Sequence, residues 1–349
     1  MKAYKIGVCG NFDVEHVEAN GQTIKTINVY NELVKVYGKE NIKKLDTYYF
    51  RTNPIKAVFA YLKLVKECEH CVILPAEGAV KVLVPLGVIQ KKRYKTKIYY
   101  PVIGAWLGKM LKEKKRLLRY AKSIDWVLPE TETLKKELLE VGLERVEVLL
   151  NFKDIPVLSE EEINISVEKP LKLCYFARVN EMKGIGELIE AVKNVNREQV
   201  KFTLDIYGPV KDIYSETFRG LMENFPEYIK YCGVADGDKS VETLKGYFMQ
   251  VFPTKYATEG IPGSLVDSLC AGVPVLSARW NSCHDILDEG STGISFELCN
   301  FKEMEEKLEQ IAENPQQIIA MRVNCIKKAL KYKPEEAIRV LTDRIEEGQ

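Results

Sequence analysis

The feature that most constrains the fold is an alternation of short apolar runs and longer amphipathic segments, repeated along the chain without hairpin signals. "YKIGVCG" at residues 4–10 has the character of a strand, "TIKTINVYNELVKVYG" at 23–38 that of a helix, and the strand-like runs "CVILPA", "KIYYPV" and "DWVLPE" follow. The alternation resumes at "LKLCYFAR", residues 171–178, and continues through "KFTLDIYGP", "YIKYCGV", "YFMQVFPT" and "PVLSA". Strand–helix–strand order of this kind predicts parallel sheets joined by right-handed crossovers.

Two such series in 349 residues predict two domains. Periodicity is lost and acids and prolines accumulate between Asn151 and Lys169, which we take as the joint. We therefore expect a first domain over residues 1–155, a second over 156–332, and a C-terminal helix over 333–349 that packs back across the joint. The predicted fold class is α/β, with two Rossmann-like, doubly wound parallel-sheet domains facing each other across a ligand cleft.

The composition is that of an ordinary soluble protein, 46% apolar and 29% charged. The longest apolar runs are shorter than the roughly 20 residues that span a membrane, and the first residues lack a signal-peptide pattern. Nine cysteines, an odd number, suit reduced thiols and predict a cytoplasmic location. Cys68 and Cys71 form the one close pair, for which a metal or redox role and two plain thiols both remain open.

The charge is unevenly distributed along the chain. Residues 1–155 hold 28 basic and 18 acidic side chains, a net charge of +10, and the remainder, with 23 basic and 32 acidic, carries −9. Twelve basic residues and one acid, Glu113, lie within residues 91–122, where 103–122 reads as a helix with one apolar face. This segment suggests peripheral, transient contact with an anionic membrane. No nucleic acid is expected as a partner, because the segment lacks interleaved aromatic residues for base stacking.

The stretch "TEGIPGSLVDSLCAGVPVLSA", Thr258–Ala278, carries the most informative local pattern. Ser264 and Asp267 have the spacing of a capping box at a helix start, and "VPVLSA" reads as a buried strand. Free amides at such a helix start suit a phosphate, and Asp267 would either cap the helix or bind a ribose diol. Glu259 has no role in this local account, and it would lie where a sugar attached to that phosphate emerges.

Two further segments are candidates for anion binding. Gly21, Gln22 and Thr23 lie between the first strand and its helix, where a glycine allows close approach of backbone amides or simply makes a turn. Arg178 follows a strand end and Lys183 stands at the next helix start, where a cation opposes the helix dipole. Two interpretations of Arg178 and Lys183 remain open: both are solvated surface charges, or both bind a diphosphate.

Several motifs together resemble glycosyltransferase family 4, whose members are retaining enzymes of the GT-B fold. "YFARVNEMKGIGELIEAV", "LDIYGP", "VFPTKYATEGIPGSLVDSLCAGVPVLSA" and "GSTGISFE" look like the donor-binding half of that family. "NGQTIKTINVYNEL", "PVIGAWL" and "DWVLPETETLKKELLEVGLERVEVLLNF" resemble the acceptor-binding half. The likeness covers nearly the whole chain and is strongest between Leu171 and Glu297.

The resemblance assigns roles to particular residues. Arg178 and Lys183 match the cations that neutralise the leaving diphosphate, so the resemblance implies that no metal and no other cofactor is needed. Glu259 matches the first acid of the family's Glu-x7-Glu motif, which contacts the donor sugar, and Asp267 stands at the second, which binds ribose. The implied donor-binding backbone and side chains are Gly21, Gln22, Gly260, Ile261, Gly263, Ser264, Leu265 and Asp267.

Two positions depart from the family pattern. Asp267 is one methylene shorter than the usual glutamate, which puts the ribose contact in question. The family's histidine near the donor sugar is absent from "KIYYPVIG", which has Tyr99 and Tyr100, and His16 is the candidate substitute. Asp236 and Asp238 resemble a metal-binding Asp-x-Asp, but they read better as a turn in which Asp238 or Ser240 caps a helix.

The sequence therefore predicts a retaining, metal-independent transferase that moves a hexosyl or N-acetylhexosaminyl unit from a nucleotide-diphosphate sugar to an acceptor hydroxyl. The expected setting is capsular, lipopolysaccharide or exopolysaccharide assembly, with a lipid-linked saccharide as the acceptor partner. A GT-B-fold nucleotide-sugar epimerase and a non-catalytic nucleotide-sugar-binding protein remain alternatives. Release of nucleotide that depends on an acceptor separates the transferase from both.

Overall fold

The computed structural model describes residues 2–12, 21–50, 52–163 and 166–347. They form two compact units, one of residues 1–154 with 332–349 and the other of residues 155–331. Each unit has a parallel sheet with helices on both faces, as the alternation of the sequence predicted. The boundary at 154/155 lies inside the predicted joint.

The first unit is built on a sheet with the order β2-β1-β3-β4-β5 among the described residues. Its strands are β1 (Tyr4–Gly10), β2 (Ile42–Asp46), β3 (Cys68–Leu74), β4 (Lys97–Pro101) and β5 (Trp126–Leu128). Its helices are α1 (Gly21–Tyr37), α2 (Pro54–Glu67), α3 (Glu77–Tyr94), α4 (Leu107–Glu113), α5 (Lys115–Ala121), α6 (Glu132–Glu140) and α15 (Pro334–Glu346).

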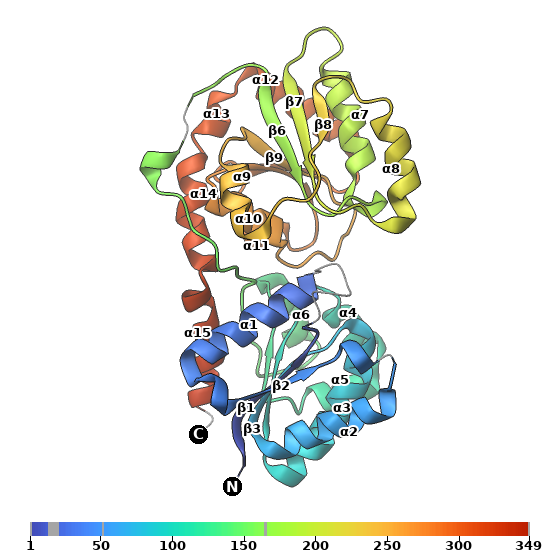
Figure 1. The fold of residues 1–349 in the computed structure, drawn as a ribbon, viewed down its shortest axis with the longest axis vertical. Helices are drawn as coiled ribbons and strands as arrows, with labels where there is room; N and C mark the ends of the chain where they lie inside the picture. Colours follow the sequence, from blue (N-terminus) through green and yellow to red (C-terminus); the bar gives the residue numbers. More distant parts are fainter. Residues whose placement is uncertain (1, 13–20, 51, 164–165, 348–349) are drawn as a thin grey trace. The chain divides into compact units, whose positions relative to one another are not determined.

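Two apolar layers sandwich this sheet. Helices α2 to α6 bury their inner sides on one face, and α1 and α15 cover the other (Figure 1). The expected helix over 103–122 is instead two helices, because the backbone breaks at Lys114 (φ −110°, ψ 79°). The predicted apolar face comprises Leu107, Met110, Leu111, Leu117, Leu118 and Ala121. All but Leu118 are buried, and Leu118 is half-buried against the same core.

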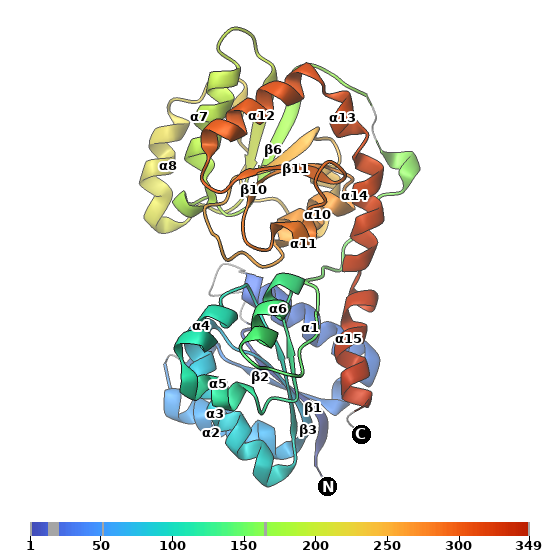
Figure 2. The same cartoon turned by 180° about the vertical axis from the view of Figure 1, so that it is seen from behind.

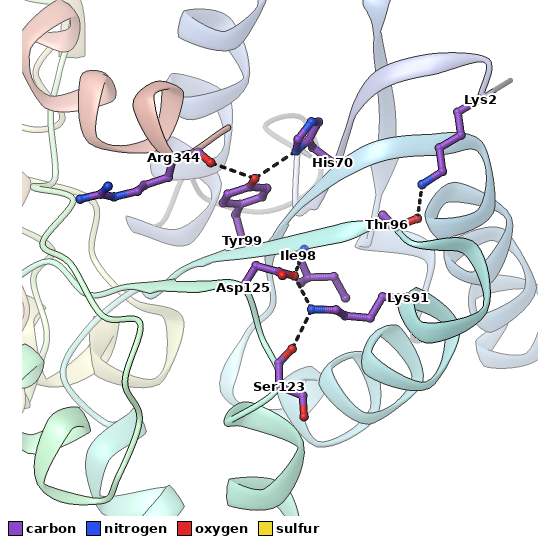
Figure 3. A network of polar contacts seen from close by, with 9 residues as sticks. All are labelled: Lys2, His70, Lys91, Thr96, Ile98, Tyr99, Ser123, Asp125 and Arg344. Carbon is purple, nitrogen blue, oxygen red and sulfur yellow. Dashed lines mark hydrogen bonds and ion pairs between the residues drawn. The ribbon is translucent and has the colours of Figure 1, made fainter. Parts of the chain in front are cut away.

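The C-terminal helix α15 belongs to the first unit, against which it packs. Figure 3 shows the Tyr99 hydroxyl of β4 between His70 and the backbone of α15: it donates to the Arg344 carbonyl (3.1 Å) and lies 3.0 Å from His70 Nδ1. The Arg344 guanidinium adds an ion pair to Glu147 (2.7 Å) and lies 4.3 Å from the Trp126 ring centroid. These contacts fix the helix on strands β4 and β5.

The second unit has the sheet order β11-β10-β9-β6-β7-β8 among the described residues. Its strands are β6 (Leu171–Phe176), β7 (Phe202–Tyr207), β8 (Ile229–Tyr231), β9 (Met249–Phe252), β10 (Val275–Arg279) and β11 (Gly293–Glu297). Its helices are α7 (Ile185–Val195), α8 (Ser215–Met222), α9 (Ser240–Leu244), α10 (Gly263–Cys270), α11 (Cys283–Ile286), α12 (Phe301–Glu313), α13 (Gln316–Ile319) and α14 (Arg322–Ala329).

The core of the second unit explains its helix positions. α7 buries Ile185, Leu188, Ile189 and Val192 at helical spacing against the sheet, next to α12 (Figure 2). α10 is buried along nearly its whole length, from Leu265 to Cys270. Within the described residues, none of the helices is long and apolar enough to cross a membrane.

The buried histidine of β3 predicts a pH-dependent stability. The Tyr99 hydroxyl donates its hydrogen to the Arg344 carbonyl, so it can only accept a hydrogen bond from His70. Neutral His70 therefore carries its hydrogen on Nδ1, and a further proton would bind at Nε2. Burial, and then the charges of Lys97, Lys5 and Lys2, lower the pKa of His70 from 6.5 to about 4.

As the pH falls from about 6.5 to 4, His70 is protonated in the unfolded state but stays neutral in the folded state. The free energy of unfolding therefore falls by up to about 3 kcal/mol over this range. We expect His70→Gln, whose amide can still donate to Tyr99, to remove this part of the pH dependence. Urea unfolding of both proteins at several pH values measures it, and parallel curves between pH 4 and 6.5 would contradict it.

Candidate functional site

The direction in which the chain adds strands to the second sheet reverses between β6 and β9, which are parallel neighbours. From β6 the chain moves outward through β7 to β8, then returns to β9 and proceeds through β10 to β11. In open α/β sheets, ligands bind outside the carboxyl ends of the strands at such a switch point. Here the segments that leave those two ends are residues 177–184 and 253–262, which contain the three residues predicted to be catalytic.

Two of these residues contact each other. The Lys183 ammonium, at the end of a 3₁₀ turn over Glu181–Lys183, forms an ion pair with Oε1 of Glu259. The Thr254 hydroxyl donates to the same oxygen at 2.8 Å. The ammonium also lies 4.8 Å from the Phe252 ring centroid, and Lys183 is only 8% exposed. The structure thus brings together a cation and an acid that are 76 residues apart in sequence.

The site carries more positive than negative charge. Burial lowers the pKa of Lys183, Glu259 opposes this shift, and the positive charges of Arg178 and Lys211 add to it. A second anion next to Lys183 would therefore be favourable, since two further positive charges, Arg178 and Lys211, act on this ammonium. Lys211, in the loop after β7, was not among the predicted residues. The strand "KFTLDIYGP" was recognised, but nothing local indicated that its following loop reaches the β6 end.

Arg178 is a cation of this group whose side chain is not held by the described part of the protein. It is half-buried, and among the described residues its guanidinium has no hydrogen-bond or ion-pair partner. Its backbone carbonyl accepts a hydrogen bond from the Tyr175 hydroxyl at 2.7 Å, and the neighbouring Val179 carbonyl accepts from the amide of Lys211 at 3.1 Å. The backbone is thus held by two contacts, and the guanidinium is available to an anion.

Glycines allow these loops to approach one another. Gly184 has φ +71°, and a Cβ there would lie 2.0 Å from the Pro253 carbonyl oxygen. At Gly208, with φ +139°, a Cβ would lie 1.9 Å from the Ala177 carbonyl oxygen. Only glycine fits both the backbone angle and the space at these positions. The loops after β6, β7 and β9 are therefore packed backbone to backbone around Lys183.

The start of α10 differs from the prediction. Pro262 is the N-cap, Gly263 and Ser264 are the first two helical residues, and no side chain caps the helix. The predicted capping box is wrong, because the helix begins at Gly263 and Ser264 therefore lies inside its first turn and not at the N-cap. Leu265 donates to the Pro262 carbonyl (3.0 Å), whereas the amides of Gly263 and Ser264 have no backbone acceptor among the described residues.

Buried apolar contacts hold this helix start in place. Gly260 is buried, and Ile261 and Leu265 are 3% and 1% exposed. Ile261 and Leu265 thus anchor the segment in the core, and from these two positions a ligand could meet only backbone atoms.

Asp267 is committed to a neighbouring helix. Its Oδ1 accepts a hydrogen bond from the Ser240 hydroxyl at 2.9 Å, and the residue is 2% exposed. Its assignment to a ribose stays a prediction. The turn before Ser240 is capped by Asp236, whose carboxylate accepts from the amide of Asp238 at 3.1 Å. The turn interpretation was right, but the capping residue is neither Asp238 nor Ser240.

The predicted residues of the first unit lie at the switch point of its own sheet, between β1 and β3. Gly21 is the first described residue of α1, with open space where a Cβ would be. The Gln22 amide donates to the Leu74 carbonyl at the end of β3 (3.1 Å). His16 lies outside the described residues.

Neither tyrosine of β4 replaces the histidine of the family pattern. Tyr99 is fully buried, and its hydroxyl is engaged by His70 and Arg344. Tyr100 is 1% exposed and packs in the opposite apolar layer. Both rings serve the core of the first unit.

The two close cysteines also belong to that core. Cys68 and Cys71 are buried in β3, where a hydrogen bond to Cys68 and burial raise the pKa of Cys71. Over the described ranges, no three His, Cys, Asp or Glu side chains group as a metal site.

Comparison with known proteins now identifies the class. A family model described as glycosyl transferases group 1 matches residues 158–332, half of the chain and nearly all of the second unit. The chain belongs to this family.

Curated relatives are distant. An uncharacterised glycosyltransferase of Methanocaldococcus jannaschii, MJ1069, is 21% identical over 208 residues, which cover 55% of this chain and 50% of the relative. The amylovoran biosynthesis glycosyltransferase AmsK of Erwinia amylovora is 22% identical over 176 residues, 48% of this chain and 42% of the relative. The chain matches about half the length of these relatives.

Solved structures show the same fold over the full length. HepE of Anabaena, in complex with UDP and glucose, superimposes with a TM-score of 0.72 at 12% identity and covers 99% of this chain and 100% of its own. The lipopolysaccharide outer core galactosyltransferase WaaB gives 0.71 at 13% identity, with 99% and 100% coverage. The predicted GT-B fold class, two Rossmann-like parallel-sheet domains, is confirmed.

The close packing at Gly184 yields a prediction about stability. Gly184→Ala places a methyl group against the Pro253 carbonyl at a left-handed backbone angle, and should lower the free energy of unfolding by about 2 to 5 kcal/mol.

Gly186→Ala is the matched control, because its methyl group would meet the Tyr214 hydroxyl at an ordinary 3.5 Å. Chemical denaturation compares the two variants. Equal stabilities would show that the loops around Lys183 are not packed as described.

Proposed function

We propose that the protein transfers a sugar from a nucleotide-diphosphate donor to an acceptor hydroxyl, with retention of anomeric configuration and without a metal ion. The observation that carries this proposal is the buried contact between Lys183 and Glu259 at the switch point, with Arg178 and Lys211 adding positive charge. Lys183 has three donor hydrogens, so it can hold Glu259 and still donate to a phosphate oxygen. The amides of Gly263 and Ser264 at the α10 start would bind the same diphosphate.

In the proposed reaction the acceptor hydroxyl attacks the anomeric carbon on the side from which the diphosphate leaves. The bond from that carbon to the phosphate oxygen breaks, and the hydroxyl proton passes to an oxygen of the departing diphosphate. Arg178 and Lys183 stabilise the negative charge that develops there, while Glu259 orients the sugar. Side-chain cations thereby supply the charge that other transferases obtain from a metal.

The relatives guide the choice of substrates. HepE binds UDP and glucose in its solved complex, and AmsK is named for amylovoran biosynthesis. We therefore propose a UDP-linked hexose or N-acetylhexosamine as donor. The proposed acceptor is a saccharide, carried on a lipid at the cytoplasmic side of the membrane, in the assembly of a surface polysaccharide.

The site contacts predict which variants lose activity. Glu259→Gln and Lys183→Ala should each reduce turnover about 10² to 10³-fold, because each removes a contact that strengthens as the donor bond breaks. Lys183→Ala should also lower the melting temperature, since it leaves Glu259 half-buried without its cation. Glu259→Gln keeps the shape of the side chain but leaves the Lys183 ammonium without its carboxylate, so melting temperatures of both variants are measured beside their turnover.

The assay is release of free nucleotide from donor sugars, with and without saccharide acceptors. Acceptor-dependent release together with a retained anomeric configuration supports the transferase. Donor binding without release, or interconversion of sugars with the nucleotide still attached, would replace it by the binding protein or the epimerase. Wild-type turnover in both variants would remove the assigned site.

A further inference from the structure

The outer side of helices α2 to α5 forms one strongly basic surface. Helix α2 packs against α3, and α5 packs against both α3 and α4. The inner sides of all four helices contribute to a single apolar layer. Fourteen exposed basic side chains lie on their outer sides and connecting turns, against the exposed acids Glu77 and Glu113. We name this set the basic face: Lys56, Lys63, Lys66, Lys81, Lys92, Arg93, Lys95, Lys109, Lys112, Lys114, Lys115, Arg116, Arg119 and Lys122.

Most of this charge is not neutralised within the protein. Among the described residues, ion pairs of the basic face join Lys63 to Glu67 at 3.8 Å and Lys112 to Glu140 at 3.9 Å. Lys91, part of the basic segment in sequence, points inward instead, where its ammonium contacts Asp125 and donates to the Ser123 carbonyl at 2.8 Å (Figure 3). Charges that repel one another on one surface weaken the compact state, so folding does not account for them.

Apolar side chains project from the same surface. Ile55 and Phe59, one turn apart on α2, are 72% and 68% exposed, and Val82 and Ile89 on α3 are 48% and 55% exposed. Lys56 and Lys63 flank Phe59 on the outer side of α2. Large aliphatic and aromatic groups set among lysines match an interface that offers anionic groups and hydrocarbon together.

We propose that the basic face binds an anionic lipid bilayer, with Ile55 and Phe59 inserted at the boundary between head groups and acyl chains. The lysines and arginines would lie among the head groups, each adding roughly fivefold to the affinity. Nucleic acid would satisfy the charges but offers no hydrocarbon to Ile55, Val82 and Ile89, so a bilayer fits the observations better. The basic face extends the segment predicted from sequence, residues 91–122, by α2 and by the part of α3 before Lys91.

The test is co-sedimentation of the full chain with vesicles of phosphatidylcholine alone or with 30% phosphatidylglycerol (about one lipid in three). We expect binding to the anionic vesicles, at least tenfold weaker binding in 0.5 M salt, and little binding to pure phosphatidylcholine. Ile55→Ser with Phe59→Ser should weaken the binding about tenfold or more, because the apolar insertion is lost while the charge is unchanged. Binding to heparin and to duplex DNA is measured beside vesicle binding, because these polyanions offer negative charge without hydrocarbon.

The matched control is Ile213→Ser with Val234→Ser in the second unit, where two apolar side chains are 94% and 66% exposed. This control should bind as the wild type does. Equal recovery with both vesicle types, equal effects of the two double variants, or polyanion binding in place of vesicle binding would overturn the proposal. Donor turnover on a water-soluble acceptor should be unchanged in Ile55→Ser/Phe59→Ser, so failure here is distinguishable from failure of the proposed reaction.

Discussion

The burial of the Lys183 ammonium beside the Glu259 carboxylate is the interaction on which the second unit's chemistry depends. Taking both charges out of water costs several kcal/mol, and removing either partner leaves the other uncompensated. The pair is held where the loops leaving β6 and β9 meet, with Gly184 pressed against the Pro253 carbonyl and Thr254 bonded to Glu259. The surrounding cations Arg178 and Lys211 oppose the charge of Lys183, which makes the site receptive to a further anion.

Much of the fold could be predicted because it depends on period and order. Parallel strands buried on both faces leave apolar runs such as those at β6 and β10, and the absence of hairpin signals fixes the crossovers. What could not be predicted depends on one or two backbone angles. Lys114 divides the expected long helix into α4 and α5, and Pro262 displaces the expected cap from Ser264. Neither effect changes the hydrophobic periodicity of the sequence.

The candidate site shows the same division. Glu259 and Lys183 stood out because local rules gave them no role, and the structure joins them. Lys211 and Thr254 did not stand out, because their importance comes from loops that meet only when the sheet forms. Asp267 was recognised, but its hydrogen bond to Ser240 depends on a helix that is distant in sequence. Local spacing can suggest a residue's chemistry, whereas its partners are set by topology.

The central claim, that cations at the β6–β9 switch point hold a nucleotide diphosphate, is tested most directly by calorimetric titration of UDP into the wild type and Arg178→Ala. The guanidinium has no partner among the described residues, so its removal should leave the fold unchanged. Loss of a charge-assisted contact should weaken UDP binding at least tenfold. Arg197→Ala, two residues beyond the C-terminal end of α7, should bind UDP normally. Equal UDP affinities in Arg178→Ala and the wild type would contradict the account.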